Sequence, residues 1–157
     1  MGHQKNGSSA RLRKISRPIK HIIVHCSETN DIHSAKELKE LYEKEEWHDI
    51  GYHFIVDELG NVEPGIDLAA TGYHCAAPGI EYSSIAVCYL GGQNEKGETT
   101  DTRTPAQMIA LRAVVSTLKT MFPDAEISGH NNHVRLTKCP GYDARREYAD
   151  IDGLPFK

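Results

Sequence analysis

Several features are missing from this chain of 157 residues, and each absence argues against a class of protein. It has no apolar run of about 18 residues, so we expect no transmembrane helix. None of its four cysteines belongs to a CxxC pair, which argues against a cysteine-rich zinc knuckle. It has no excess of positive charge: the formal net charge of -4 gives no general attraction to nucleic acid or to an anionic membrane. It also lacks repeats, and its length predicts a single domain.

The N-terminal segment is polar and basic, and no apolar stretch follows it. We therefore expect no secretory signal peptide. Residues 1–17 are interpreted as a flexible basic leader, ahead of a domain that spans residues 18–157. The basic side chains of this leader, including Arg17, are expected to be solvated. Contact between the leader and an acidic polymer stays open as an alternative, because its positive charges are clustered.

Short apolar runs rich in β-branched residues mark the expected strands. Residues 19–26 (IKHIIVHC) and 84–90 (SIAVCYL) are predicted to be buried strands. Residues 51–65 predict a hairpin with glycine and asparagine in its turn. A further short strand is expected at Glu126–Ser128.

Two longer helices begin at recognisable caps. Ser34 and Glu37 have capping-box spacing, and this helix is predicted to run to about Trp47. Thr104-Pro105 begins the second helix, which Pro123 stops. The C-terminal stretch YDARREYADI predicts one more short helix. Strands that alternate with helices, together with an antiparallel hairpin, predict an α/β fold in which helices flank a mixed central β-sheet.

Two histidines and a cysteine form the strongest chemical signal. His25 lies at the end of the first apolar run, and GHNNHVRLTKCPG carries His130 and Cys139. Both histidines lie at strand ends, so their side chains can converge in a cleft at the edge of the sheet. Three ligands of these types suit Zn²⁺ and leave a fourth tetrahedral position for a catalytic water. The H-x8-C spacing is not a standard zinc spacing, so purely structural roles stay open on spacing alone.

If a zinc-bound water at this site hydrolyses an amide, the reaction also needs hydrogen-bond donors for the oxyanion that forms. Thr137 and Lys138 directly precede the cysteine, and both side chains can donate. Tyr52 begins a strand that could pair beside His25. His53 points to the opposite face of that strand and is predicted to be structural.

Six motifs resemble those of the zinc-dependent N-acetylmuramoyl-L-alanine amidases. In chain order they are VHCSET, W-x-D-I-GYHF, G-N-V-E-x-G, SIAVCYLGG, TPAQ and GH…CPG-Y-D. Together they cover roughly residues 18–145 and are most similar to the small bacteriophage lysozyme-type amidases. The animal peptidoglycan recognition proteins are similar over the same core. The resemblance implies cleavage of peptidoglycan between the lactyl group of N-acetylmuramic acid and the L-alanine of the stem peptide.

The resemblance also implies roles for single residues. It implies that His25, His130 and Cys139 bind one Zn²⁺ per chain, and that Tyr52 is the catalytic tyrosine of the GYHF motif. It implies that His74 lines the substrate groove. A histidine in a surface loop, with no role in the site, is the alternative for His74.

One departure from the family pattern lies just before the cysteine. Phage-type members carry a catalytic lysine two residues before the cysteine, where this chain has Thr137, and Lys138 follows one residue later. The segment between His130 and Cys139 is also one residue longer than usual. Because some active recognition-protein amidases have threonine at this point, we favour Thr137 as the oxyanion donor and keep Lys138 as the alternative.

Two other functions stay open at this point. One is a module that binds muropeptide without cleaving it, and the other is a cytoplasmic amidase that recycles soluble anhydro-muropeptides. The presence of both Cys139 and Tyr52 favours the enzyme that degrades the wall. We expect a monomer that acts on peptidoglycan and has no nucleic-acid partner. Without a signal peptide, it would be made in the cytoplasm and reach the wall after release, through a separate pore-forming partner.

Overall fold

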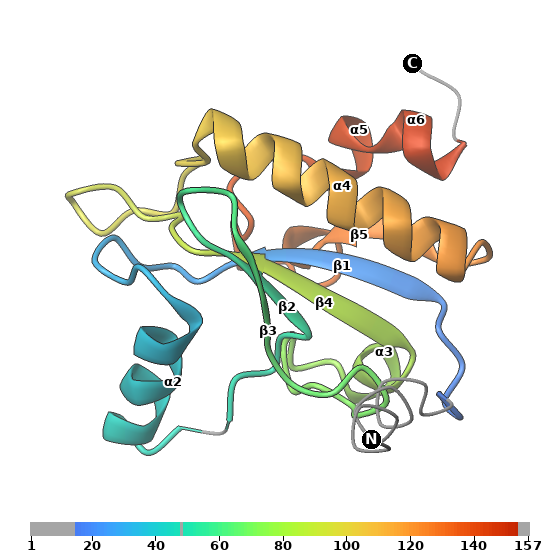
Figure 1. The fold of residues 1–157 in the computed structure, drawn as a ribbon, viewed down its shortest axis with the longest axis horizontal. Coiled ribbons are helices and arrows are strands. Elements are labelled where there is room, and N and C mark those ends of the chain that lie inside the picture. Colours follow the sequence, from blue (N-terminus) through green and yellow to red (C-terminus); the bar gives the residue numbers. More distant parts are fainter. Residues whose placement is uncertain (1–14, 48, 154–157) are drawn as a thin grey trace, which may run out of the picture.

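Five strands pair into one mixed sheet in the computed structural model, which describes residues 15–47 and 49–153 (Figure 1). The strand order is β3-β2-β4-β1-β5. Strands β2, β4, β1 and β5 are parallel, and β3 pairs antiparallel with β2. The strands are β1 (His21–Cys26), β2 (Phe54–Val56), β3 (Val62–Pro64), β4 (Ser84–Tyr89) and β5 (Glu126–Gly129). The predicted mixed sheet is confirmed, and the expected strands and hairpin are all present.

Helices cover both faces of this sheet (Figure 1). The helices are α2 (Ala35–Lys44), α3 (Pro78–Tyr82), α4 (Pro105–Met121), α5 (Ala144–Glu147) and α6 (Ala149–Asp152), and a 3-10 turn, η1, spans His130–Asn132. In the described part of the chain, no helix is long and apolar enough to cross a membrane.

Two apolar cores explain why the central strands have almost no polar positions. On β4, Ile85 and Val87 pack with Leu111 of α4 on one face of the sheet. Ala86 and Cys88 of the same strand pack in a second cluster with Leu38 of α2 on the other face. Successive side chains of a strand point to opposite faces, so a strand covered on both sides is apolar throughout.

The two predicted caps are present, with one difference of detail. The Thr104 hydroxyl accepts from the Gln107 N–H, and the Gln107 side chain accepts from the Thr104 N–H, which completes a capping box. The Ser34 hydroxyl likewise accepts from the Glu37 N–H. The Glu37 carboxylate, however, accepts from the His33 N–H one residue before the cap.

Helix boundaries differ from the prediction at three places. Helix α2 ends at Lys44 and not near Trp47, because Glu46 takes the left-handed conformation with φ 55° and stops the helix. The single C-terminal helix is divided into α5 and α6 at Tyr148. The five-residue helix α3, which begins at Pro78, was not predicted.

Arg17 is buried, so the prediction that it is solvated is wrong. The side chain is 5% exposed, and its guanidinium donates to the carbonyl oxygens of Tyr82 (2.9 Å), Ser84 (2.7 Å) and Leu68 (3.0 Å). Arg17 therefore ties the chain that precedes β1 to the α3–β4 junction. Residues 1–14 of the predicted leader lie outside the described residues.

Replacing Arg17 by alanine is expected to lower the free energy of unfolding by about 2–4 kcal/mol. The substitution removes several charge-assisted hydrogen bonds and leaves buried carbonyl oxygens without a donor. Urea unfolding measures the change, with the exposed Lys20→Ala as the matched control, expected to stay within about 0.5 kcal/mol of the parent protein. Equal losses in the two variants would contradict the anchoring role.

Candidate metal centre

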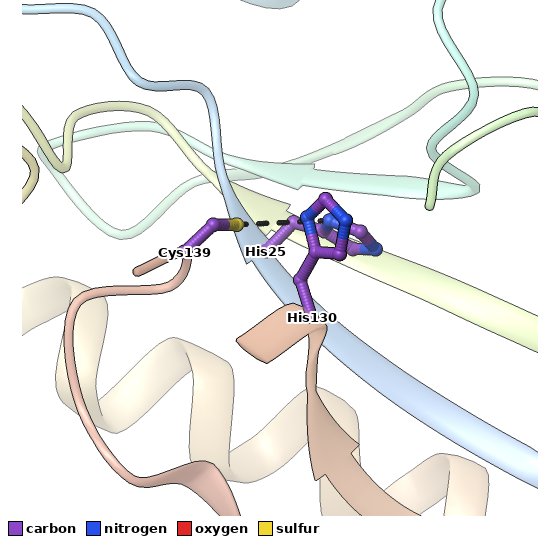
Figure 2. Close-up of side chains that lie close together, drawn as sticks. All are labelled: His25, His130 and Cys139. Carbon is purple, nitrogen blue, oxygen red and sulfur yellow. Dashed lines mark hydrogen bonds between the residues drawn. The ribbon is translucent and has the colours of Figure 1, made fainter. Parts of the chain in front are cut away.

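The side chains of His25, His130 and Cys139 meet at the carboxyl edge of the sheet (Figure 2). Their nitrogen and sulfur ligand atoms all lie within 4.8 Å of one another. The Nδ1 atom of His25 is 3.7 Å from the Cys139 sulfur, and the two imidazole rings have centroids 4.7 Å apart. The structure therefore brings together the three residues that the sequence predicts to meet.

The register of the parallel strands explains how two distant histidines become neighbours. Strand β5 pairs with β1 so that Gly129 is opposite Val24. His25 follows Val24 and His130 follows Gly129, so the two histidines are also neighbours. Both lie at the carboxyl ends of parallel strands, the edge at which open α/β sheets bind ligands.

The loop that carries Cys139 is held by hydrogen bonds to its backbone and to the cysteine sulfur. The Asn131 N–H donates to the Cys139 carbonyl oxygen at 2.8 Å, and the Tyr89 hydroxyl donates to the Pro140 carbonyl oxygen at 2.6 Å. The Cys26 N–H donates to the Cys139 sulfur itself at 3.2 Å. These contacts hold the sulfur, which is almost fully buried, against the end of β1.

The electrostatic environment of the cluster suits a cation. Burial lowers the pKa of both His25 and His130, so the two rings are neutral and can offer a lone pair. Burial, and then the neighbouring Cys26, raise the pKa of the Cys139 thiol. A bound cation would supply the positive charge that stabilises the thiolate here. Two neutral imidazoles and one thiolate form a donor set that Zn²⁺ accepts.

Tyr52 lies beside the cluster, just before β2. Its ring centroid is 5.3 Å from that of His25, and the residue is 8% exposed. Burial, followed by the nearby Cys88 and Tyr42, holds the pKa of Tyr52 well above its usual value. The hydroxyl is therefore protonated and can donate a hydrogen bond.

Thr137 and Lys138 differ in how they are held. The half-buried Thr137 hydroxyl accepts from the Cys139 N–H at 3.1 Å and donates to the Glu28 carboxylate at 3.4 Å. Lys138 is exposed. The two side chains border a hollow of about 520 Å³, which is lined by Glu28, Glu98, Thr99, Val134, Leu136, Thr137 and Lys138. No sequence pattern indicated that Glu28 contacts Thr137, because the two residues are 109 positions apart.

His74 is inside the protein, so the alternative of a surface-loop histidine is wrong. It is 8% exposed, and its Nδ1 atom lies 2.8 Å from Nε2 of His25. Its Nε2 atom lies 2.7 Å from the Ser84 hydroxyl oxygen. Burial, and then the nearby His53, lower the pKa of His74 to about 3. Sequence reasoning missed Ser84, because a serine at a strand start has no distinguishing pattern.

His53 has the structural role that strand alternation predicts. It is buried, its Nδ1 atom accepts from the Ala86 N–H at 3.0 Å, and its Nε2 atom is 2.8 Å from the Ala70 carbonyl oxygen. Both ring nitrogens thus contact the backbone of neighbouring segments, and Nε2 also lies 3.1 Å from the Arg17 guanidinium. His53 belongs to the framework of the fold and not to the cluster of His25, His130 and Cys139.

A mixed sheet with two histidines and a cysteine clustered at its carboxyl edge is the architecture of an α/β protein with a metal-binding site. The family model described as N-acetylmuramoyl-L-alanine amidase matches residues 15–142. The chain therefore belongs to the N-acetylmuramoyl-L-alanine amidase family. The resemblance seen in the six sequence motifs is confirmed.

Individual relatives agree with this assignment. The chain is 38% identical over 127 residues to the endolysin of Escherichia phage T7, covering 80% of this chain and 82% of that protein. It is 24% identical over 144 residues to a peptidoglycan-recognition protein of Drosophila melanogaster, covering 85% and 74% of the two chains. Among solved structures, the endolysin amidase LysCS from Clostridium intestinale superposes with a TM-score of 0.71 at 26% identity, covering 88% and 86% of the two chains.

Proposed function

We propose that this protein is a zinc-dependent peptidoglycan amidase that cleaves the bond between the lactyl group of N-acetylmuramic acid and the L-alanine of the stem peptide. The observation that carries the proposal is the convergence of His25, His130 and Cys139. Membership of the amidase family and similarity to phage endolysins support it. A Zn²⁺ ion held there would supply Lewis acidity towards a substrate carbonyl and would lower the pKa of water.

Residues of the chain are proposed to act as metal ligands and as hydrogen-bond donors. His25 and His130 offer neutral nitrogens, and the Cys26 N–H supports the charge of the Cys139 thiolate. The protonated Tyr52 hydroxyl is proposed to donate to the substrate carbonyl oxygen, where negative charge develops. Thr137 is proposed as a second donor, because it borders the hollow next to the cysteine.

Thr137→Ala is expected to reduce turnover by about 10²-fold, the typical effect of losing one oxyanion donor. Lys138→Ala is expected to change turnover by no more than a few-fold, because that side chain is exposed. Thr137→Ser keeps the hydroxyl and should retain most of the activity. Zinc content is measured in each variant, because the Thr137 hydroxyl also accepts from the Cys139 N–H. The opposite ranking of the two alanine variants would assign the donor role to Lys138.

The bond that is cleaved can be identified by mass spectrometry of soluble products after digestion of purified peptidoglycan. Free stem peptides that begin with L-alanine, together with intact glycan strands, are the expected products. Binding to peptidoglycan without release of peptide would instead identify a binding module. Cleavage of a small anhydro-muropeptide alone, with whole wall left intact, would identify a recycling amidase.

We infer that the protein acts on the wall as a monomer, since one chain supplies every residue of the cluster. Similarity to endolysins supports action after release, with a separate pore-forming protein providing the route. Expression of this chain alone should then leave host cells intact, and permeabilising their membrane should cause lysis. Lysis without permeabilisation, or a dimer in sedimentation experiments, would contradict these inferences.

A further inference from the structure

A row of buried hydrogen bonds runs from the metal-binding cluster into the protein. Nε2 of His25 lies 2.8 Å from Nδ1 of His74, and Nε2 of His74 lies 2.7 Å from the Ser84 hydroxyl oxygen. The Ser84 hydroxyl in turn donates to the Glu81 carbonyl oxygen at 3.3 Å. His25, His74 and Ser84 are all buried, so solvent does not compete for these contacts.

The Glu81 carbonyl oxygen, at the end of this row, determines which atom donates in each of the other hydrogen bonds. A carbonyl oxygen can only accept, so the single proton of the Ser84 hydroxyl points to Glu81. The hydroxyl oxygen then accepts from the Nε2–H of His74. A neutral imidazole carries one N–H, so Nδ1 of His74 has a lone pair and accepts from the Nε2–H of His25. This leaves the lone pair of His25 on Nδ1, the atom 3.7 Å from the Cys139 sulfur.

The position of His74 is itself fixed by the segment that follows it. The Glu81 carboxylate is buried and accepts from the N–H groups of Cys75 at 2.9 Å and Ala76 at 3.2 Å. Ser84 is fixed by strand pairing, since it lies opposite His21 in the β1–β4 register. Both ends of the hydrogen-bonded row are therefore part of the rigid framework.

We propose that His74 is a positioning residue, which accepts the Nε2–H of His25 and so holds His25 in the tautomer that turns its Nδ1 lone pair towards His130 and Cys139. The inference rests on the proposed function, because it takes His25 to be a zinc ligand. Zinc-binding histidines commonly donate their second N–H to a fixed acceptor, which sets the ring orientation and the tautomer. His74 would thus act on the metal site through its contact with His25.

The tautomer of His25 can be measured in the metal-free protein by nitrogen-15 NMR of its imidazole. The parent protein is expected to carry the proton on Nε2 of His25. In His74→Ala the two tautomers should mix, and zinc affinity should fall by roughly 10- to 100-fold. His74→Asn places an amide acceptor near the position of Nδ1 and should restore most of the affinity. A parent protein with the proton on Nδ1 of His25 would overturn the proposal.

His53→Asn is the matched control, because His53 is also buried but contacts Arg17 and the backbone of other segments. It is expected to lose stability while keeping the His25 tautomer and the zinc affinity. Equal losses of zinc affinity in His53→Asn and His74→Ala would also overturn the proposal. The tautomer is measured without zinc or substrate, so the result can contradict this inference while the proposed hydrolysis still holds. If His74→Ala does not fold, the parent tautomer alone decides.

Discussion

His130→Ala is expected to abolish both zinc binding and peptidoglycan hydrolysis. The substitution leaves His25 and Cys139 as the only donors of the three-residue cluster, and two protein ligands do not hold a catalytic zinc. The loss of zinc affinity should exceed the roughly 10- to 100-fold change that follows loss of a supporting partner. Metal analysis after dialysis, and peptide release from purified wall, measure the two effects.

His133→Ala is the matched control for this substitution. His133 is close in sequence and half-buried, but its Nε2 atom contacts the Ser128 hydroxyl at 2.8 Å, and it is not part of the cluster. This variant should keep one zinc per chain and hydrolyse the wall. Full activity in His130→Ala would refute the metal assignment outright.

Tyr52→Phe is expected to lower kcat by about 10²- to 10³-fold while zinc content stays unchanged. The phenyl ring preserves the packing against His25, so the substitution removes only the hydroxyl, together with its hydrogen bond to Tyr42. Removal of one preorganised donor to a developing oxyanion typically has an effect of this size. Steady-state release of stem peptide, with metal analysis of the same sample, measures both quantities.

Tyr82→Phe provides the comparison for Tyr52→Phe. The Tyr82 side chain is 52% exposed and lies in α3, outside the cluster, so removing its hydroxyl should leave kcat unchanged. A Tyr52→Phe enzyme with the kcat of the parent protein would contradict the donor role. Loss of zinc in that variant would instead assign Tyr52 to the support of the metal-binding cluster.

The parts of the fold that depend on neighbours in sequence could be predicted from the sequence. The hydroxyls of the caps Ser34 and Thr104 each accept from a backbone N–H three residues away, and both contacts are present. The strand-end positions of His25 and His130 placed them at one sheet edge, because parallel strands align their carboxyl ends. The order of the strands depends on long-range packing, and no local pattern specifies that β1 lies between β4 and β5.

Two of the differences from the prediction concern contacts between distant segments. Arg17 was expected to be solvated because a charged side chain in a basic stretch usually is, yet its acceptors are carbonyl oxygens more than 50 positions away. The contact of His74 with His25 spans 49 positions in sequence, so spacing gave no indication of it. Helix α3 is only five residues long, too short to show a periodic pattern.

Zinc reconstitution of the chelator-treated protein tests the central claim most directly. Bound zinc and release of stem peptide are measured together as Zn²⁺ is added back in steps. If His25, His130 and Cys139 form a catalytic zinc site, activity should be absent without metal and rise in proportion to bound zinc, up to one equivalent per chain. Full activity in protein that contains no zinc, or one bound zinc with no release of peptide, would contradict it.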